Sequence, residues 1–244
     1  MTTQRKADLL LVLITGFWGC SYYLSDLALG EMPPFALCAM RFLLAFALLG
    51  IALFPKLRHV NRKTLLWAVP AGLSLTLTYI GATVGLLYTS ISNAGFICSL
   101  PAVTTPLLTF LLYRKKPERR MLLCLVLCTV GLGLLTLGND FRPAPGDLIC
   151  LLCALGYGIN LLVVEHAVRQ PEVDALQLGV FQQLVTGAAM LVLSLLFETP
   201  CLPQTPTGWG SVLFLSVFCT GIAFAITAVQ QKHTSAVHVG MSFT

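Results

Sequence analysis

Charged side chains are scarce in this sequence. Only 10% of its 244 residues are Asp, Glu, Lys or Arg, whereas a soluble globular domain typically carries roughly 25%. So little charge cannot cover a surface that faces water, and no polar stretch is long enough to fold as a separate module. The four histidines lie in loops or near the ends of apolar runs, so the clustered catalytic groups of a membrane-embedded enzyme are missing. The composition excludes a soluble domain and argues against an enzyme.

Cysteines outside the apolar runs are almost lacking as well. Of nine cysteines, eight lie inside apolar runs and Cys201 alone lies in a loop. The Cys150-x-x-Cys153 spacing is typical of metal or redox motifs, but no second pair of ligands lies nearby. Buried thiols that pack as small hydrophobic side chains are the simpler interpretation. We expect no disulfide framework, no metal and no cofactor.

Long apolar runs fill most of the chain, which is 57% hydrophobic with a mean hydropathy of +0.85. About 20 apolar residues cross the hydrocarbon of a bilayer as a helix. Lone strands cannot satisfy their backbone in lipid, and the runs lack the alternation of a barrel. The sequence predicts an all-α integral membrane protein with lipid as its surroundings. Eight predicted spans cover about 8–29, 34–54, 65–88, 92–113, 120–138, 147–165, 176–197 and 208–230, and a ninth apolar segment begins near 234.

Basic residues gather in every second connection between these spans. Thirteen of the fifteen lie on one side, while Arg142 lies in an opposite loop and Arg41 inside a span. The positive-inside rule makes the rich side cytoplasmic. We therefore predict a multi-pass protein of the cell membrane (plasma or inner) with a cytoplasmic N-terminus, and no nucleic-acid partner.

Similar positions recur along the chain at offsets of 139 to 145 residues. The pairs are Trp18-Gly19 with Tyr157-Gly158, Asp26 with Glu165, Arg41 with Gln182, and Tyr88-Thr89-Ser90 with His233-Thr234-Ser235. They predict two related halves of five spans, residues 1–138 and 139–244. Because five is odd, the second half enters the membrane from the opposite side, a plan typical of secondary transporters with a site near the midplane. The alternative is that apolar helices simply resemble one another.

The repeat also predicts that the second half is truncated. The offset places Thr244 opposite Ser99, early in the fourth span. We expect about eight complete transmembrane helices and the start of a ninth from a ten-helix (5+5) inverted-repeat fold. A non-transporting membrane-protein fragment that lacks the last two helices is the alternative to a working transporter.

Several short motifs follow one another in a characteristic order. They are Phe17-Trp18-Gly19, Arg41-Phe42, Tyr88-Thr89-Ser90-x-Ser92-Asn93-Ala94, Gly131-Leu132-Gly133-Leu134, Gly146-Asp147-Leu148 and Thr234-Ser235-Ala236. Their order and spacing resemble the EamA-type family of the drug/metabolite transporter (DMT) superfamily over the whole chain. The resemblance implies a secondary transporter, commonly an exporter, of small metabolites, amino acids or drugs. We expect alternating access as the mechanism, and a homodimer is one assembly that the sequence allows.

Arg41 is the most informative candidate for a substrate site. It lies about 10 Å along its span from the outer end, well inside the hydrocarbon. A central arginine costs roughly 2.5–3.5 kcal/mol on insertion scales, so it should face a partner or a watery cavity. The functional interpretation is attraction of an anionic substrate group such as a carboxylate. The structural one is a pair with Asp26 or with helix-end carbonyls.

Other polar and aromatic residues at membrane depth could line the same pathway. With Arg41, the candidates are Trp18, Tyr22, Tyr79, Asn93, Tyr157, Asn160 and Gln182. The rival interpretation of each is hydrogen bonding between helices, which such side chains commonly supply. Pro101 and Pro106 in the fourth span predict a kinked helix.

Overall fold

The computed structural model describes residues 3–114, 123, 126–127, 130–131, 144–232 and 234–241. All secondary structure in these residues is helical, and they contain no strand. The helices are α1 (Thr3–Leu29), α2 (Pro34–Ala52), α3 (Phe54–Leu57), α4 (Arg62–Leu86), α5 (Ile91–Cys98), α6 (Pro101–Tyr113), α8 (Pro145–Val168), α9 (Ala175–Phe197), α10 (Pro206–Phe214), the π-helical η1 (Leu215–Ile222), α11 (Ala223–Gln231) and α12 (Ala236–Met241).

Six of the described helical segments are long and apolar enough to cross a membrane. They are Pro34–Ala52, Arg62–Leu86, Ile91–Leu112, Pro145–Val168, Ala175–Phe197 and Pro206–Gln231. Each coincides with a span predicted from the sequence, and α1 covers the first predicted span. The predicted span at 120–138 lies outside the described residues apart from a few isolated positions. The helical multi-pass architecture is confirmed, and the count of ten helices stays a prediction.

Prolines and polar caps set where the helices begin. α2, α6, α8 and α10 each carry proline in the first turn, where its missing N–H breaks no helical hydrogen bond. α4, α5, α9 and α10 follow a side chain that accepts a backbone N–H of the first turn. These caps are Asn61, Ser90, Asp174 and Thr205.

Acidic side chains also fasten helix starts to neighbouring elements. The carboxylate of Glu198, just after α9, accepts the backbone N–H groups of Phe35 and Ala36 at 2.9 Å each. Asp147 in α8 accepts the backbone N–H of Ala144 at 2.9 Å. The first N–H groups of a helix have no partner inside it and carry partial positive charge, so a carboxylate there is stabilising.

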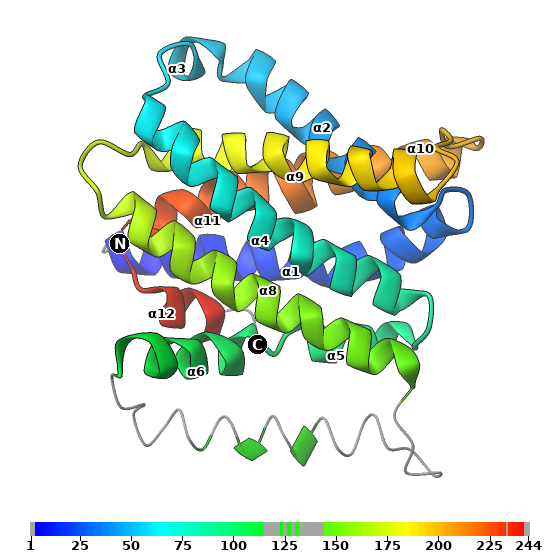
Figure 1. Ribbon diagram of the computed structural model, residues 1–244, viewed down its shortest axis with the longest axis horizontal. Helices are drawn as coiled ribbons and strands as arrows, with labels where there is room; N and C mark the ends of the chain where they lie inside the picture. The colour runs from blue at the N-terminus through cyan, green and yellow to red at the C-terminus, as the bar shows by residue number, and fades with distance from the viewer. Residues whose placement is uncertain are drawn as a thin grey trace.

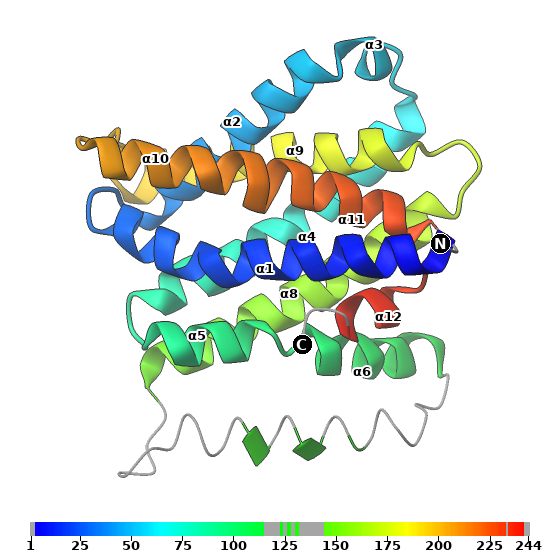
Figure 2. The ribbon, with the colours of Figure 1, turned by 180° about the vertical axis from the view of Figure 1, so that it is seen from behind.

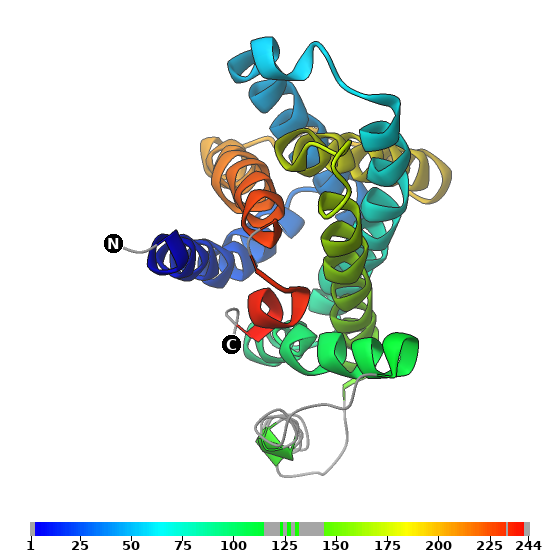
Figure 3. The same cartoon turned by 90° about the vertical axis from the view of Figure 1, so that its left-hand side faces the viewer.

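The helices run roughly side by side in one bundle (Figure 1). α4 packs along α8 and α9, and α2 packs along α9. α4 and α8 approach closely because glycines face the contact: a Cβ on Gly156 would lie 2.7 Å from the backbone nitrogen of Thr78. α1 lies along the other side of the bundle, against α10, η1 and α5 (Figure 2). Figure 3 looks along the bundle and shows α1 on one side and α4 and α8 on the other.

The fourth predicted span, for which the prolines predicted a kink, is broken before Pro101, whereas Pro106 lies inside α6. α5 ends at Cys98 and α6 begins at Pro101. Between them, the Ser99 hydroxyl donates to the carbonyl of Phe96 at 2.7 Å. Proline cannot donate a helical hydrogen bond, which explains the break. The short α12 packs against α6 and α8 at the opposite end from α5 (Figure 1).

Candidate functional site

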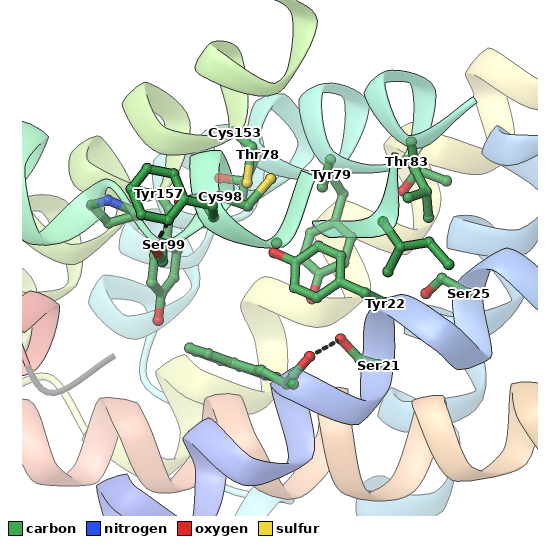
Figure 4. Close-up of a pocket in the computed structure, with 18 of the residues that line it drawn as sticks. Ser21, Tyr22, Ser25, Thr78, Tyr79, Thr83, Cys98, Ser99, Cys153 and Tyr157 are labelled. Atoms are coloured by element: carbon green, nitrogen blue, oxygen red, sulfur yellow. Dashed lines mark hydrogen bonds between the residues drawn. The ribbon is translucent and has the colours of Figure 1, made fainter. Parts of the chain in front are cut away.

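A cavity of about 510 Å³ lies between α1, α4, α5 and α8 and reaches α2 and α11 (Figure 4). Its walls carry many hydroxyls and aromatic rings, and Arg41 is the one charged residue among its described lining. The lining residues are Thr15, Trp18, Gly19, Ser21, Tyr22, Ser25, Arg41, Thr78, Tyr79, Ala82, Thr83, Leu86, Ile91, Ser92, Gly95, Phe96, Cys98, Ser99, Pro101, Cys153, Tyr157 and Phe224.

Arg41 lies on α2 and is 4% exposed. Its Nε donates to the hydroxyl of Thr220, and its Nη2 lies 3.2 Å from the hydroxyl of Tyr79 and 3.4 Å from the carbonyl oxygen of Cys219. Neither of the two ion pairs found among the described residues involves Arg41. The expected structural alternative, a pair with Asp26, is therefore wrong, because Asp26 is exposed and forms no ion pair in the described structure. The carbonyl that does bind Arg41 lies in mid-span and not at a helix end.

The π-helix η1 explains how a carbonyl in mid-span becomes a partner for other helices. The carbonyl oxygen of Cys219 accepts the indole N–H of Trp18 at 2.8 Å as well as the Arg41 guanidinium. The Cys219 thiol in turn donates to the carbonyl of Phe17 at 3.2 Å. A π-helical turn disturbs the regular ladder of backbone bonds and is frequent at functional sites. η1 thus joins α1 and α2 at the depth of the cavity.

Four rings, the aromatic cluster (Trp18, Tyr79, Tyr157 and Phe224), form much of the wall next to Arg41. The Trp18 centroid lies 5.5 Å from that of Tyr157 and 5.6 Å from that of Phe224. Phe224 lies 6.2 Å from Tyr79 and 6.3 Å from Tyr157. The Arg41 guanidinium carbon lies 4.9 Å from the Tyr79 ring centroid, within the range of a cation–π contact. The structure therefore brings four of the predicted pathway residues together.

Tyr22, a fifth predicted pathway residue, also lines the cavity, beside a group of thiols (Figure 4). Cys98 at the end of α5 and Cys150 and Cys153 of α8 belong to one buried cluster, and Tyr22 packs against it. All three cysteines are free thiols. The Cys-x-x-Cys spacing thus reflects one face of α8 packed on α5. Across the residues that the structure describes, no group of His, Cys, Asp and Glu is placed to hold a metal ion.

Asn160 and Gln182 lie in a second polar cluster, outside the cavity. The Asn160 amide donates to the carbonyl of Ala71 at 2.8 Å, and lies 3.3 Å from the Ser74 hydroxyl and 3.3 Å from the Gln182 side-chain oxygen. Asn160 is 2% and Gln182 1% exposed. In this conformation both side chains bridge α4, α8 and α9. This agrees with the rival interpretation, hydrogen bonding between helices.

Asn93 belongs to a joint between α5 and α8. Its side-chain amide lies 3.4 Å from a carboxylate oxygen of Asp147, which also accepts the hydroxyl of Thr89. Asp147 is 4% exposed. The buried carboxylate of Asp147 is thus satisfied by groups at the start of α5 and in the loop before it. Asn93 does not line the cavity. Asp147 belongs to the motif Gly146-Asp147-Leu148, but its contact with α5 depends on how the helices pack and cannot be read from that motif.

Several cavity residues were missed from the sequence, among them Thr78, Ser21 and Ser99. Thr78 and Ala82 recur at i and i+4 in α4, next to the predicted Tyr79, so the helical period could have found them. Ser99 lies at the break between α5 and α6. Its place at the wall depends on the geometry of that break, which no periodicity reveals.

Known proteins match this chain over most of its length. Residues 5–137 and 144–244 match the EamA-like transporter family. An uncharacterized transporter of Archaeoglobus fulgidus is 32% identical over 163 residues, which are 67% of this chain and 50% of that protein. The uncharacterized transporters YetK and YvbV of Bacillus subtilis are 26% and 24% identical, and each alignment covers 91% of this chain and 70% and 74% of the relative. This chain therefore spans half the length of the first relative.

A protein of known crystal structure has the same fold. It superposes with a TM-score of 0.73 at 22% sequence identity, over 98% of this chain and 84% of that one. At this identity the likeness concerns the fold alone. It agrees with a helical bundle arranged as described above.

Proposed function

This chain belongs to the EamA-like transporter family, and from that premise we propose that it moves small molecules across the cell membrane through the cavity at Arg41. The proposal is a secondary transporter of small metabolites, amino acids or drugs, working as an exporter by alternating access. In this proposal the described helices are part of a ten-helix fold of two inverted halves, with the N-terminus in the cytoplasm.

The observation that carries the proposal is a buried cation without a carboxylate partner among the described residues, at the wall of a cavity large enough for a ligand. Arg41 lines a space of about 510 Å³, and ligand pockets measure roughly 300–1,000 Å³. An ionisable group at membrane depth is costly and typically marks a substrate or ion pathway. A purely structural arginine would be expected to meet an acidic partner.

The two polar clusters support the inverted repeat. Arg41 of α2 bonds Cys219 and Thr220 of η1. Its repeat counterpart, Gln182 of α9, bonds Asn160, which in turn bonds Ser74 of α4. The offset of 145 residues places Cys219 opposite Ser74. α2 thus meets η1, and α9 meets α4, at positions that the repeat relates. The first contact is direct and the second runs through Asn160.

The two ends of the bundle differ in a way that alternating access requires. At one end, Ile91 lines the cavity, and the exposed Asp26 makes no side-chain hydrogen bond in the described structure. At the other end Glu165, the repeat counterpart of Asp26, accepts the backbone N–H of Ala236 at 2.9 Å. The offset of 145 residues makes Ala236 the counterpart of Ile91. We propose that the end at Ile91 is the open one, that the end at Glu165 is closed, and that transport exchanges the two.

Reconstituted vesicles test the proposal. The purified chain in liposomes should release trapped, labelled small carboxylates faster than empty liposomes do. Arg41→Ala should abolish this flux while the protein still inserts, because the cation that attracts the anionic group is gone. Arg58→Ala, which removes an exposed cation far from the cavity, should leave the flux unchanged. Full flux in the Arg41 variant would remove this residue from the pathway, and no flux from the intact chain would contradict transport by it.

A further inference from the structure

We infer that the cavity selects small organic monoanions with an apolar or aromatic body. Arg41 receives the anionic group, and the aromatic cluster receives the body. This inference rests on the proposed transport function and specifies the substrate class of the same site.

The anionic end follows from the hydrogen-bond inventory of Arg41. A guanidinium carries five N–H donors and no acceptor. Nε is directed to Thr220, and Nη2 to Tyr79 and Cys219. The described structure gives Nη1 no hydrogen-bond partner, although Arg41 lines the cavity. A carboxylate at this point would gain charge-assisted hydrogen bonds, which are roughly twice as strong as neutral ones.

The restriction to one negative charge follows from the rest of the lining. Its described residues include no lysine, no histidine and no second arginine. A dianion would therefore keep one charge without a cationic partner at membrane depth, which is costly. A cation would meet the positive Arg41, and the described lining offers no aspartate or glutamate to offset the repulsion.

The apolar end follows from the aromatic cluster. Tyr157 and Phe224 are 6% and 2% exposed, and both line the cavity beside Trp18. Rings held edge to face by one another offer rigid apolar area at low cost in conformational entropy. The lining hydroxyls near Arg41 accept or donate without adding charge. An anion without an apolar body would gain no contact with these rings.

Calorimetry on the purified full chain in lipid nanodiscs tests the inference with probes of nearly equal size. The probes are 3-phenylpropionate as the monoanion, 3-phenylpropionamide as the neutral form and 3-phenylpropylamine as the cation. We expect the carboxylate to bind about tenfold or more tightly than the amide, as a charge-assisted contact implies, and the amine to show no measurable binding. Acetate, which lacks the apolar body, should bind at least about tenfold more weakly than phenylpropionate.

Variants assign this preference to Arg41. In Arg41→Gln the affinities for the carboxylate and the amide should become equal within about twofold, because the charge is lost. Arg41→Lys keeps a charge and should keep the preference for the anion, which guards against a result caused by misfolding. The matched control, Arg58→Gln, removes an exposed positive charge outside the cavity and should retain the full preference.

The outcomes separate this inference from the transport proposal. Equal or tighter binding of the amide or the amine, or a preference that survives in Arg41→Gln, would overturn the anion inference. Charge-selective binding combined with no flux in liposomes would support the substrate site and contradict transport by this chain. Flux of labelled small molecules without any preference for anions would support transport by this chain and overturn the anion inference.

Discussion

At the scale of single residues, Arg41 and Asn160 show two outcomes for polar groups in an apolar bundle. Arg41 lies on the wall of a cavity and has a donor nitrogen without a described partner. Asn160 shares its amide among three acceptors on two other helices. Both are almost fully buried. Their roles differ because one faces space and the other faces side chains.

Replacing Asn160 tests its structural role. Asn160→Ala removes the described donor to the Gln182 side-chain oxygen and to the Ala71 carbonyl. A buried acceptor left without a partner costs about 1–3 kcal/mol, so the thermal unfolding temperature in detergent should fall. Binding of 3-phenylpropionate should stay within about twofold of the wild type, because Asn160 lies outside the cavity. Gln204→Ala, on the exposed loop before α10, serves as control; unchanged stability or lost binding in Asn160→Ala would contradict this assignment.

At the scale of helices, the fold depends on two kinds of contact: close helix crossings and polar joints at helix ends. The crossing of α4 and α8 needs glycine at the interface, since an added Cβ at Gly156 would meet the backbone of Thr78. The loop between α1 and α2 is tied to the start of α10 through Glu31. The crossing of α4 and α8 joins two helices that line the cavity.

Alanine at the crossing should force the two helices apart. In Gly156→Ala the new Cβ would lie 2.7 Å from the Thr78 nitrogen and 3.0 Å from its hydroxyl oxygen, closer than real contacts allow. Overpacking of this kind costs about 1–3 kcal/mol or more, so we expect a lower unfolding temperature and a smaller yield of folded protein. Gly16→Ala is the matched control, because nothing lies within 4 Å of its added Cβ. Equal stability of the two variants would show that the crossing tolerates a wider spacing.

The Glu31 joint predicts a dependence of stability on pH. The hydrogen bond from the Thr205 hydroxyl, and then those from the backbone N–H groups of Gln204 and Thr205, lower the pKa of the Glu31 carboxyl from its ordinary value of 4.5. A carboxyl with a lowered pKa in the folded state stabilises that state fully above its unfolded pKa. This contribution is lost as the pH falls below 4.5 and through the lowered pKa.

Unfolding measured between pH 7 and pH 3 checks this. The wild type should lose stability below about pH 4.5, and Glu31→Gln should be less stable at neutral pH and lose less on acidification. Glu172→Gln is a suitable control, since its ion pair with Lys63 is exposed and exposed pairs contribute little. Parallel acid profiles for wild type and Glu31→Gln would contradict the proposed role of the joint.

At the scale of the whole molecule, the two ends of the bundle differ in their contacts, and the proposed mechanism has the end at Ile91 open and the end at Glu165 closed. The contact of Glu165 with the start of α12 lies at one end, and the cavity reaches Ile91 at the other. If the open and closed ends exchange during transport, the hydrogen bond between Glu165 and Ala236 should stabilise the present conformation and raise its population. Its removal would then favour the conformation in which the cavity is closed at α5.

Labelling of Cys98 reports on that balance, because its thiol lies on the cavity wall. Glu165→Ala removes a hydrogen bond to the Ala236 N–H, which is worth about 1 kcal/mol. The equilibrium constant between the two conformations should therefore shift about fivefold, and the rate of N-ethylmaleimide labelling at Cys98, resolved by mass spectrometry, should fall by up to about fivefold. Glu172→Ala should label at the wild-type rate. A rate that does not change in Glu165→Ala would separate this contact from the access of the cavity.

Much of the architecture follows from local sequence. The lengths of the apolar runs predicted the six described spans, and Pro101 and Pro106 predicted a kink in the fourth span, where the structure has a break before Pro101. These features depend on neighbours in the chain and on the mismatch between an apolar segment and water, so they can be read from the residues. The cavity candidates Trp18, Tyr22 and Tyr79 were found in the same way, as large side chains at helical spacing in apolar runs.

The sequence by itself determined that the chain is a helical membrane protein of the EamA-like family and that Arg41 requires a polar environment. The tertiary structure alone decided which groups supply that environment: a π-helical carbonyl and a hydroxyl 178 and 179 residues away, in place of Asp26. It also separated Asn93, Asn160 and Gln182 from the cavity. The reason is physical. A polar side chain in lipid must find a partner, and which partner it finds depends on how helices distant in sequence pack against one another.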